Sequence, residues 1–482
     1  MSEHVYTQTI NGVAAPITAT FDVINPATGA VFAQAPECTP QQVEEVMNAA
    51  HEAFKTWRNA KDERRTALHA AADIIEANTE RLVEILVKEQ GKPKTDAGIE
   101  IFAATMVFRY YADLEIAPDV IQDDEVAYSA VIRQPIGPAV AITAWNIPII
   151  LATCKIAPLL AAGNTVILKP SPYTPLTTLL LGELLRDVFP PGVLNVVSGG
   201  LSFGPELTQH PLTRKITMTG STATGKKVAA AAAAGVKRVT LELGGNDAAI
   251  VLEDADPKVI AQRIFWGSFR NSGQLCIAAK RIYVHESIVA EVTEELAAIA
   301  STVTLGDGMD DSTQLGPLQN LAQFEKVSDI VEDALAKGAK AVTGGHKLDR
   351  EGYFYAPTIL ADARHGMRVV DEEQFGPVMP IISFSDVEEV LKLANDTEFG
   401  LGGSVWTSDS ARGAALARRL EAGMVWVNTH SDNVFPTQPF GGVKQSGIGL
   451  EMGPWGYIAS TDAQTIYESR RTDTMSKQIH VA

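Results

Sequence analysis

The segment Lys215-Ile-Thr-Met-Thr-Gly-Ser-Thr-Ala-Thr-Gly225 decides the fold, because it joins an apolar, β-branched run to a helical pattern through a glycine turn. Residues 215–219 predict a buried strand, and residues 223–234, which include an alanine-rich stretch, predict a helix. A helix that begins directly after a strand presents backbone N–H groups at its start, where a phosphate group can bind. A plain tight turn is the alternative explanation of the glycines. Either way, the segment predicts one α/β unit.

The same alternation of short apolar runs and helical patterns extends on both sides of this segment. Continuous apolar strands that alternate with helices are typical of a parallel sheet covered on both faces. We therefore predict a doubly wound α/β fold of the nucleotide-binding kind. The predicted strands are residues 139–144, 165–168, 193–197, 215–219 and 239–243, and the predicted helices lie near residues 150–162, 174–188, 202–209 and 223–234.

The pattern changes before and after this region. Three helices are predicted in the N-terminal part, at residues 40–60, 63–78 and 80–89, and the polar residues 114–131 favour a protruding β-hairpin. A second alternating stretch runs from about residue 250 to about residue 440. Residues 463–467 show a lone strand pattern near the chain end. Such a strand must pair with an edge of its own chain or with a partner chain.

Composition argues against several classes of function. The 482 residues carry 40 Lys and Arg against 58 Asp and Glu, a net charge of −18, which argues against nucleic acid as a partner and against a basic membrane-surface protein. The apolar segment 147–163 contains Lys155 and Pro158, so it predicts a buried helix and no membrane span. The nine histidines show no HExxH or comparable spacing, so we expect no metal site.

Cysteine usage and the start of the chain bear on the compartment. Three scattered cysteines, Cys38, Cys154 and Cys276, cannot form a disulfide framework. The start MSEHVYTQTI lacks a basic region followed by an apolar run. Both observations favour a reducing compartment, and we expect a cytoplasmic protein.

The glycine turn differs from the two common phosphate-binding motifs. No GxGxxG is present, and the nearest string, from Gly447 to Gly453, has the wrong spacing and follows no predicted strand. The string from Gly220 to Lys227 approaches the P-loop pattern GxxxxGK[ST], but Lys227 stands where Ser or Thr would hold Mg²⁺. A P-loop nucleotide hydrolase is therefore disfavoured.

Three polar side chains lie where predicted strands end or in the loops just after them: Asn146, Glu242 and Cys276. In open parallel sheets that edge is where ligands bind. Separately, each residue has an ordinary explanation, as a turn former, an ion-paired carboxylate and an inert buried thiol. Together, a thiol, a carboxylate and an amide supply a nucleophile, a base and an oxyanion donor.

An ordered series of short motifs accompanies these residues along almost the whole chain. In this series the sequence resembles the aldehyde dehydrogenase superfamily. The resemblance implies a Rossmann-type cofactor domain, an α/β catalytic domain and a small β oligomerisation element. The matching strings are Ile24–Gly29, Ala144–Pro148, Gly163–Pro170, Gly220–Gly225, Leu241–Gly245, Gly273–Cys276, Glu373–Pro377 and Pro439–Gly442.

The resemblance assigns a role to each residue of the trio. Cys276 would attack the aldehyde carbon and carry first a thiohemiacetal and then a thioester. The side-chain amide of Asn146 and the backbone N–H of Cys276 would bind the oxyanion. Glu242 would activate the hydrolytic water as a general base. An acylating relative, which passes the thioester to coenzyme A, usually lacks that glutamate, and a non-catalytic binding protein of this family would have lost the thiol or the amide.

The resemblance also implies a nicotinamide cofactor. Lys169 would hold the adenosine ribose, and Glu373 the nicotinamide ribose with Phe375 beside it. Pro172 stands where strongly NAD-selective relatives often have Glu, so NADP stays open; we expect NAD, because Lys169 is the only basic residue expected near the adenosine ribose. The cofactor-binding residues implied are Ile142, Trp145, Lys169, Gly220, Ser221, Gly225, Glu373 and Phe375.

The same correspondence implies a mostly apolar substrate pocket, which suits a hydrophobic or aromatic aldehyde. Arg270 is the exception, because semialdehyde dehydrogenases use an arginine there to hold a distal carboxylate. They tend to have a second arginine where this chain has Cys154, so succinate semialdehyde is the second candidate, and a solvent-facing Arg270 is equally open. The pocket residues implied are Ile147, Leu151, Cys154, Arg270, Leu275, Ile277, Val434 and Phe440.

The domain division follows from the resemblance. Residues 1–113 and 134–249 would form the dinucleotide-binding domain, and residues 250–457 the catalytic domain. Residues 114–133 and 458–482 would form the oligomerisation element, which absorbs the lone terminal strand. We expect a homodimer or a homotetramer that acts on a small-molecule aldehyde.

Overall fold

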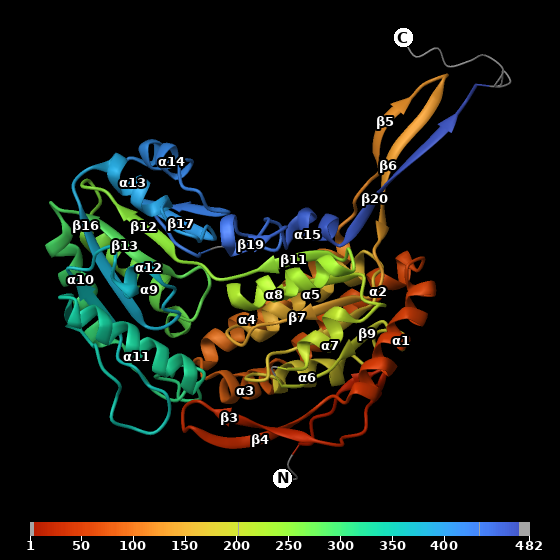
Figure 1. Cartoon of the computed structure of the whole chain (residues 1–482), viewed down its shortest axis with the longest axis horizontal. Helices are drawn as coiled ribbons and strands as arrows, with labels where there is room; N and C mark the ends of the chain where they lie inside the picture. Colours follow the sequence, from red (N-terminus) through yellow and green to blue (C-terminus); the bar gives the residue numbers. More distant parts are fainter. Residues whose placement is uncertain (1–3, 201, 433, 472–482) are drawn as a thin grey trace.

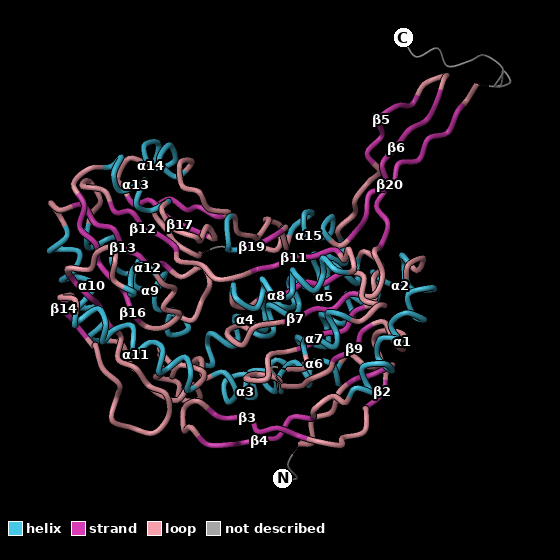
Figure 2. The backbone as a smooth tube through the Cα atoms, in the orientation of Figure 1, coloured by secondary structure: helices cyan, strands magenta, loops and turns pink. Residues whose placement is uncertain are grey.

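The computed structural model describes residues 4–200, 202–432 and 434–471. Two large sheets, each with helices around it, form the body, and a small sheet projects from it as an arm (Figures 1 and 2). Within the described residues, no helix is long and apolar enough to cross a membrane.

The first sheet contains the predicted doubly wound unit. Its strands run in the order β19-β11-β10-β7-β8-β9-β1-β2, with the five strands from β11 to β9 parallel. All five predicted strands are confirmed to within two residues at each end. They are β7 (Ala139–Ile142), β8 (Val166–Lys169), β9 (Leu194–Val196), β10 (Lys215–Thr219) and β11 (Arg238–Glu242), and the antiparallel edges are β1 (Thr9–Ile10), β2 (Val13–Ala14) and β19 (Gly447–Ile448).

Helices surround this sheet, and the strand-to-helix turn at Ser221 shows why they begin where they do. The Ser221 hydroxyl accepts a hydrogen bond from the Thr224 backbone N–H and so caps the helix α8. One long N-terminal helix, α4, was not predicted. The helices are α1 (Pro40–Trp57), α2 (Lys61–Ala77), α3 (Thr79–Gln90), α4 (Lys94–Asp113), α5 (Pro148–Ala161), α6 (Leu176–Leu184), α7 (Gly204–Gln209), α8 (Thr222–Ala234) and α15 (Gly453–Ala459).

The second sheet follows in the chain and is also mostly parallel. Its order is β14-β15-β16-β13-β12-β17-β18, and only the edge strand β14 is antiparallel within it. Separate apolar clusters lie on its two faces. Its strands are β12 (Asp247–Val251), β13 (Ala279–His285), β14 (Lys340–Thr343), β15 (Thr358–Ala361), β16 (Val378–Phe384), β17 (Gly402–Trp406) and β18 (Met424–Val427), and its helices are α9 (Pro257–Phe269), α10 (Val289–Thr302), α11 (Leu321–Ala336), α12 (Arg368–Asp371), α13 (Val387–Asn395) and α14 (Ser410–Ala417).

The arm confirms the predicted hairpin and the predicted terminal strand. It consists of β5 (Asp119–Asp123), β6 (Ala127–Pro135) and β20 (Thr461–Ser469), and β20 pairs with β6 along its whole length (Figure 1). Apolar side chains on it are exposed, among them Ile121 at 71% and Tyr467 at 61%. A further hairpin, β3 (Thr20–Asn25) and β4 (Ala30–Pro36), lies beside the helices that surround the first sheet.

The chain passes from the first sheet to the second between Glu242, the last residue of β11, and Asp247, the first of β12. It returns to the first sheet only at β19. The predicted division into functional domains stays a prediction, and the part of the proposed oligomerisation element beyond residue 471 lies outside the described residues.

Candidate active site

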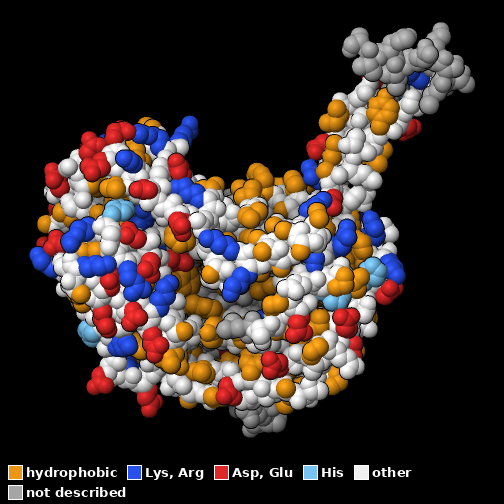
Figure 3. All heavy atoms as spheres, in the orientation of Figure 1, with side chains coloured by type: hydrophobic (Ala, Val, Ile, Leu, Met, Phe, Trp, Pro, Cys, Tyr) orange, Lys and Arg blue, Asp and Glu red, His pale blue; other side chains and the backbone are white. Residues whose placement is uncertain are grey.

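A cavity of about 780 Å³ lies where the two sheets meet. Residues after β7, β8 and β10 line one side of it, and the loops that precede β13 and β16 line the other. In the first sheet β7 lies between β8 on one side and β10 on the other, so the strand order reverses its direction at β7. The cavity opens at this switch point, where ligands are expected to bind. The space-filling view shows a hollow between the two halves of the body, with basic side chains along it (Figure 3).

The cavity brings together most of the predicted catalytic and cofactor-binding residues. Glu242 is absent from its lining, although the next two residues, Leu243 and Gly244, belong to it. Gly225 is also absent from the lining. It packs against the side chain of Leu243, with which a Cβ at this position would collide. The predicted residues that line the cavity are Ile142, Trp145, Asn146, Leu151, Lys169, Gly220, Ser221, Cys276, Glu373 and Phe375.

Asn146 is held by bonds from two distant segments. Its backbone oxygen accepts hydrogen bonds from Lys92 Nζ at 3.0 Å and from Asn271 Nδ2 at 2.9 Å. Its side-chain Nδ2 donates to the backbone oxygen of Gln274 at 2.9 Å, two residues before Cys276. An amide nitrogen carries two hydrogens, so the second one is available to a ligand. Among the described residues Nδ2 makes no second hydrogen bond, so the amide is fixed beside the cysteine loop with one donor available.

Cys276 lies before a strand and not after one, which corrects the prediction for this residue. It follows the short 3₁₀ turn η1 (Arg270–Gly273) and precedes β13. Asn271 and Ser272 both have left-handed backbones, with φ of 53° and 55°. Such strain in residues other than glycine is typical of functional loops. The carboxyl edge of the first sheet thus meets the amino edge of the second at the thiol.

Burial controls the thiol of Cys276. It raises the pKa of Cys276 to about 12, and the ammonium group of Lys280 acts in the opposite direction. The resting side chain is therefore a neutral thiol, and a reaction at sulfur needs a group that takes its proton.

Glu242 ends strand β11 with only 2% of its surface exposed. Neither carboxylate oxygen has a hydrogen-bond partner among the described residues. Burial, and then the charge of Glu451, raise the pKa of Glu242 well above its ordinary value, while Lys155 opposes the shift. Lys155 Nζ in turn lies 2.5 Å from Glu451 Oε1. A raised pKa makes this carboxylate a stronger base than an ordinary one.

Two of the lysines that line the cavity are Lys169 and Lys227. Burial lowers the pKa of Lys169 to about 8. Among the described residues, its ammonium group makes two long hydrogen bonds to backbone oxygens, at 3.3 and 3.4 Å, and lies 5.8 Å from the centre of the Phe203 ring. The expectation that no other basic residue lies nearby was wrong, because Lys227 on α8 also lines the cavity. Helical spacing could have found it, since Thr224, Lys227 and Ala231 share one face of α8 and all three line the cavity.

Glu373 also lines the cavity and contacts two other segments of the chain. Its Oε1 accepts a hydrogen bond from the Gly245 N–H at 3.0 Å and lies 3.3 Å from Lys280 Nζ. Phe375 adopts a left-handed backbone, with φ of 54°, and its ring meets Trp145 edge to face at 5.3 Å. Two lysines near Glu373, Lys280 and Lys326, were not predicted.

The predicted substrate pocket is only partly assembled in this cavity. Leu151 lines it. Cys154 instead lines a separate, very small cavity together with Lys155 and Glu451. The Arg270 side chain is 47% exposed and lies 3.9 Å from Asp432. The remaining predicted residues are partly buried and lie outside the cavity lining: Ile147, Leu275, Ile277, Val434 and Phe440.

Potential metal ligands do not cluster in the part of the chain that the structure describes, where no group of three or more His, Cys, Asp or Glu side chains could hold an ion.

Comparison with known proteins gives a consistent family. The aldehyde dehydrogenase family model matches residues 14–466. A mitochondrial aldehyde dehydrogenase of Leishmania tarentolae is 39% identical over 96% of this chain and 95% of its own. A mitochondrial succinate-semialdehyde dehydrogenase of Arabidopsis thaliana is 40% identical over 91% of this chain and 84% of its own.

A solved structure is similar over the whole fold. The structure of a Staphylococcus aureus betaine aldehyde dehydrogenase in complex with NAD⁺ has a TM-score of 0.94 and 32% identity, and the match covers 98% of this chain and 96% of that one. The predicted fold class and the resemblance are both confirmed. The chain belongs to the aldehyde dehydrogenase family.

Proposed function

We propose that the protein oxidises an aldehyde to a free carboxylic acid with NAD(P), through a covalent intermediate on Cys276. The observation that carries the proposal is the hydrogen bond from Asn146 Nδ2 to the Gln274 backbone oxygen, beside the cavity that both Asn146 and Cys276 line. This bond joins the amide to the loop that carries the thiol, so that both can act on one carbonyl group.

The side chains divide the reaction among them. The Cys276 thiol gives its proton to water, and the sulfur adds as thiolate to the aldehyde carbon. The second hydrogen of the Asn146 amide binds the oxyanion that forms. A bound nicotinamide supplies the oxidation by accepting a hydride. Glu242 then takes a proton from the water that hydrolyses the thioester, for which its raised pKa is suited. The presence of Glu242 favours hydrolysis over transfer to coenzyme A.

The cavity residues fit a dinucleotide. A volume of about 780 Å³ is within the range of cofactor sites. The buried Lys169, whose hydrogen bonds among the described residues are long, can hold the hydroxyls of one ribose, and Glu373 can hold those of the other. The NAD⁺ complex of the Staphylococcus aureus relative supports NAD. Pro172 and Lys227 in the lining leave room and charge for the 2′-phosphate of NADP.

For the substrate we propose a hydrophobic or aromatic aldehyde. Leu151 supplies apolar surface within the cavity lining, and the other predicted pocket residues apart from Cys154 and Arg270 also have apolar side chains. Succinate semialdehyde is the second candidate, because a succinate-semialdehyde dehydrogenase is among the relatives and Arg270 is accessible. Against it, the uncharged Cys154 lies in a separate cavity and offers no second cation.

For assembly we propose a homodimer or homotetramer. The exposed apolar side chains Val120, Ile121 and Tyr467 on the arm would be covered by another subunit. A cytoplasmic location also stays a prediction.

The test is a screen of purified protein with NAD and with NADP across aliphatic, aromatic and carboxylate-bearing aldehydes, with product identification. We expect reduced cofactor and free acid in equal amounts, with kcat/KM highest for hydrophobic or aromatic aldehydes. No cofactor reduction with any aldehyde would contradict the proposed oxidation, and a preference for carboxylate-bearing aldehydes would select the second candidate.

A further inference from the structure

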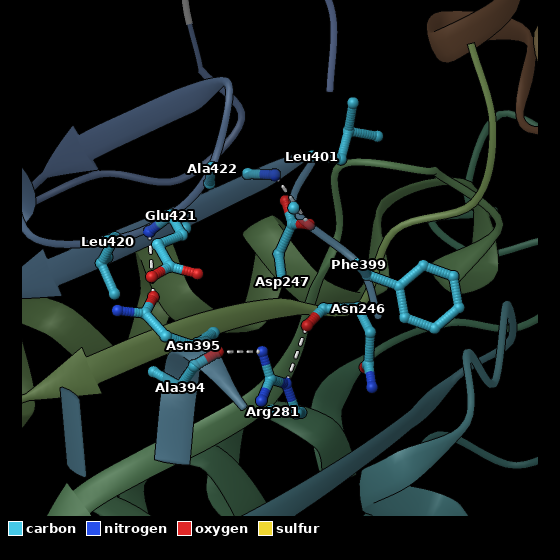
Figure 4. A pocket seen from close by; sticks show the side chains of 14 residues that line it. Asn246, Asp247, Arg281, Ala394, Asn395, Phe399, Leu401, Leu420, Glu421 and Ala422 are labelled. Atoms are coloured by element: carbon cyan, nitrogen blue, oxygen red, sulfur yellow. Dashed lines mark hydrogen bonds between the residues drawn. The ribbon is translucent and has the colours of Figure 1, made fainter. Parts of the chain in front are cut away.

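Lys280 is an extra residue in strand β13, without a partner in the neighbouring strand β12. In the pairing of β12 with β13, Asp247 lies opposite Ala279 and Ala248 lies opposite Arg281, so Lys280 is the extra residue of a bulge. Bulges redirect side chains and are frequent beside active sites. The next side chain, Arg281, donates instead to the backbone oxygens of Asn246 and Ala394 (Figure 4).

The ammonium group of Lys280 contacts both the loop that carries Cys276 and the side chain of Glu373. Lys280 Nζ donates to the backbone oxygen of Cys276 at 2.6 Å and lies 3.3 Å from Glu373 Oε1. It also lies 5.8 Å from the centre of the Phe375 ring, within the range of a cation–π contact. The Lys280 side chain is only 3% exposed, so solvent screens its charge weakly.

Other charges near Cys276 do not help the thiolate. The charged groups that act on its thiol are Lys280, Glu373, Asp247 and Glu242, and Lys280 alone among these four is a cation. The neighbouring lysine, Lys326, lines the same cavity and donates from α11 to the backbone oxygen of Glu373 at 2.8 Å, and among the described residues it makes no hydrogen bond to the Cys276 loop.

We propose that Lys280 positions the nucleophile loop and supplies its positive charge: it ties the Cys276 carbonyl to the Glu373 carboxylate and stabilises the thiolate of Cys276. The inference rests on the proposed role of Cys276 as nucleophile. In this proposal, the ammonium group that contacts Glu373, a predicted cofactor-binding residue, also sets the reactivity of the Cys276 thiol.

Alkylation of Cys276 by iodoacetamide tests this without aldehyde or cofactor. The rate follows the fraction of thiolate, and mass mapping of the Cys276 peptide separates it from Cys38 and Cys154. Removal of this buried positive charge should raise the pKa of the thiol by about one unit, so Lys280→Gln and Lys280→Met should react about tenfold more slowly at pH 8. Lys280→Arg, which keeps the charge, should stay within about threefold of wild type.

Lys326→Met is the matched control, because it removes a cation that contacts Glu373 but not Cys276. It should alkylate within about twofold of wild type. Circular dichroism identifies any variant that fails to fold, and the Gln and Arg variants then decide between charge and packing. Wild-type reactivity in Lys280→Gln, or equal slowing in Lys326→Met, would overturn the proposal. Because the assay needs no turnover, its failure is distinct from a failure of the proposed oxidation.

Discussion

Lys92 Nζ donates a hydrogen bond to the backbone oxygen of Asn146 at 3.0 Å, and the same ammonium group forms a buried ion pair with Glu100. Glu100 Oε1 accepts a hydrogen bond from the Ile149 N–H at 2.7 Å, at the start of α5. The two side chains, which are 2% and 3% exposed, therefore hold both ends of the turn that presents the Asn146 amide. They lie 54 and 46 residues before Asn146 in the chain and act on it through the fold.

Lys92→Met should lower kcat about tenfold, because the Asn146 turn loses a fixed contact, while the Kd for NAD changes little. It should also lower the free energy of unfolding by about 3 kcal/mol, because Glu100 stays buried without its partner. Lys94→Met is the control, since Lys94 is 36% exposed and pairs with a surface carboxylate. Steady-state kinetics and denaturant unfolding measure both effects, and a normal kcat in Lys92→Met would dismiss the positioning role.

Asn146→Ala should lower kcat by about 10²–10³, the usual cost of one oxyanion donor. The side chain also donates to the Gln274 oxygen, and Asn146→Asp loses this donor together with the oxyanion donor. Because aspartate keeps the size of the side chain, it separates the loss of the amide hydrogens from the cavity that alanine leaves. Both should bind NAD within a few-fold of wild type, as measured by fluorescence titration. A loss of binding equal to the loss in kcat would mean that the amide acts on the cofactor instead.

Glu242→Gln should accumulate an acyl thioester on Cys276, because hydrolysis loses its base. Burial raises the pKa of Glu242, so the wild-type deacylation rate should increase with pH through a value well above the ordinary carboxyl pKa of about 4.3. Below that value the carboxyl group is protonated and cannot accept a proton. Rapid-quench kinetics across pH measure this rise in the deacylation rate. The same rise in Glu242→Gln would assign the base to another group.

Lys227→Glu should weaken NADP binding about tenfold or more and NAD binding far less, because a carboxylate repels a 2′-phosphate. Lys226→Glu is the control, since Lys226 is the neighbouring exposed residue of α8 and is absent from the cavity lining. Titration calorimetry with both cofactors gives the ratio. Equal weakening of NAD and NADP would place Lys227 away from the phosphate.

The sequence predicts those parts of the fold in which local pattern and tertiary burial agree. The strand 215–219 appears with the predicted bounds, because its residues are buried throughout and Ser221 caps the following helix. Helix α4 was missed because its pattern misleads: Ile99, Phe102 and Met106 are exposed on it. Glu100, on the same helix, is buried although it is charged, because it accepts a hydrogen bond from the Ile149 N–H.

The site shows the same division. Motif resemblance is enough to bring Asn146, Cys276 and Glu373 to one cavity. It does not show that Cys276 precedes its strand, because only the sheet order reveals which edge the loop occupies. Nor could it find Lys280, because a bulge in β13 aims that side chain, and no local spacing encodes the bulge.

Replacement of the Cys276 sulfur tests the central claim most directly. Cys276→Ser should abolish aldehyde-dependent formation of reduced cofactor, while NAD binding by fluorescence titration stays within about threefold of wild type, because the hydroxyl is a far weaker nucleophile than a thiolate. Turnover at a substantial fraction of the wild-type rate in this variant would contradict the covalent account.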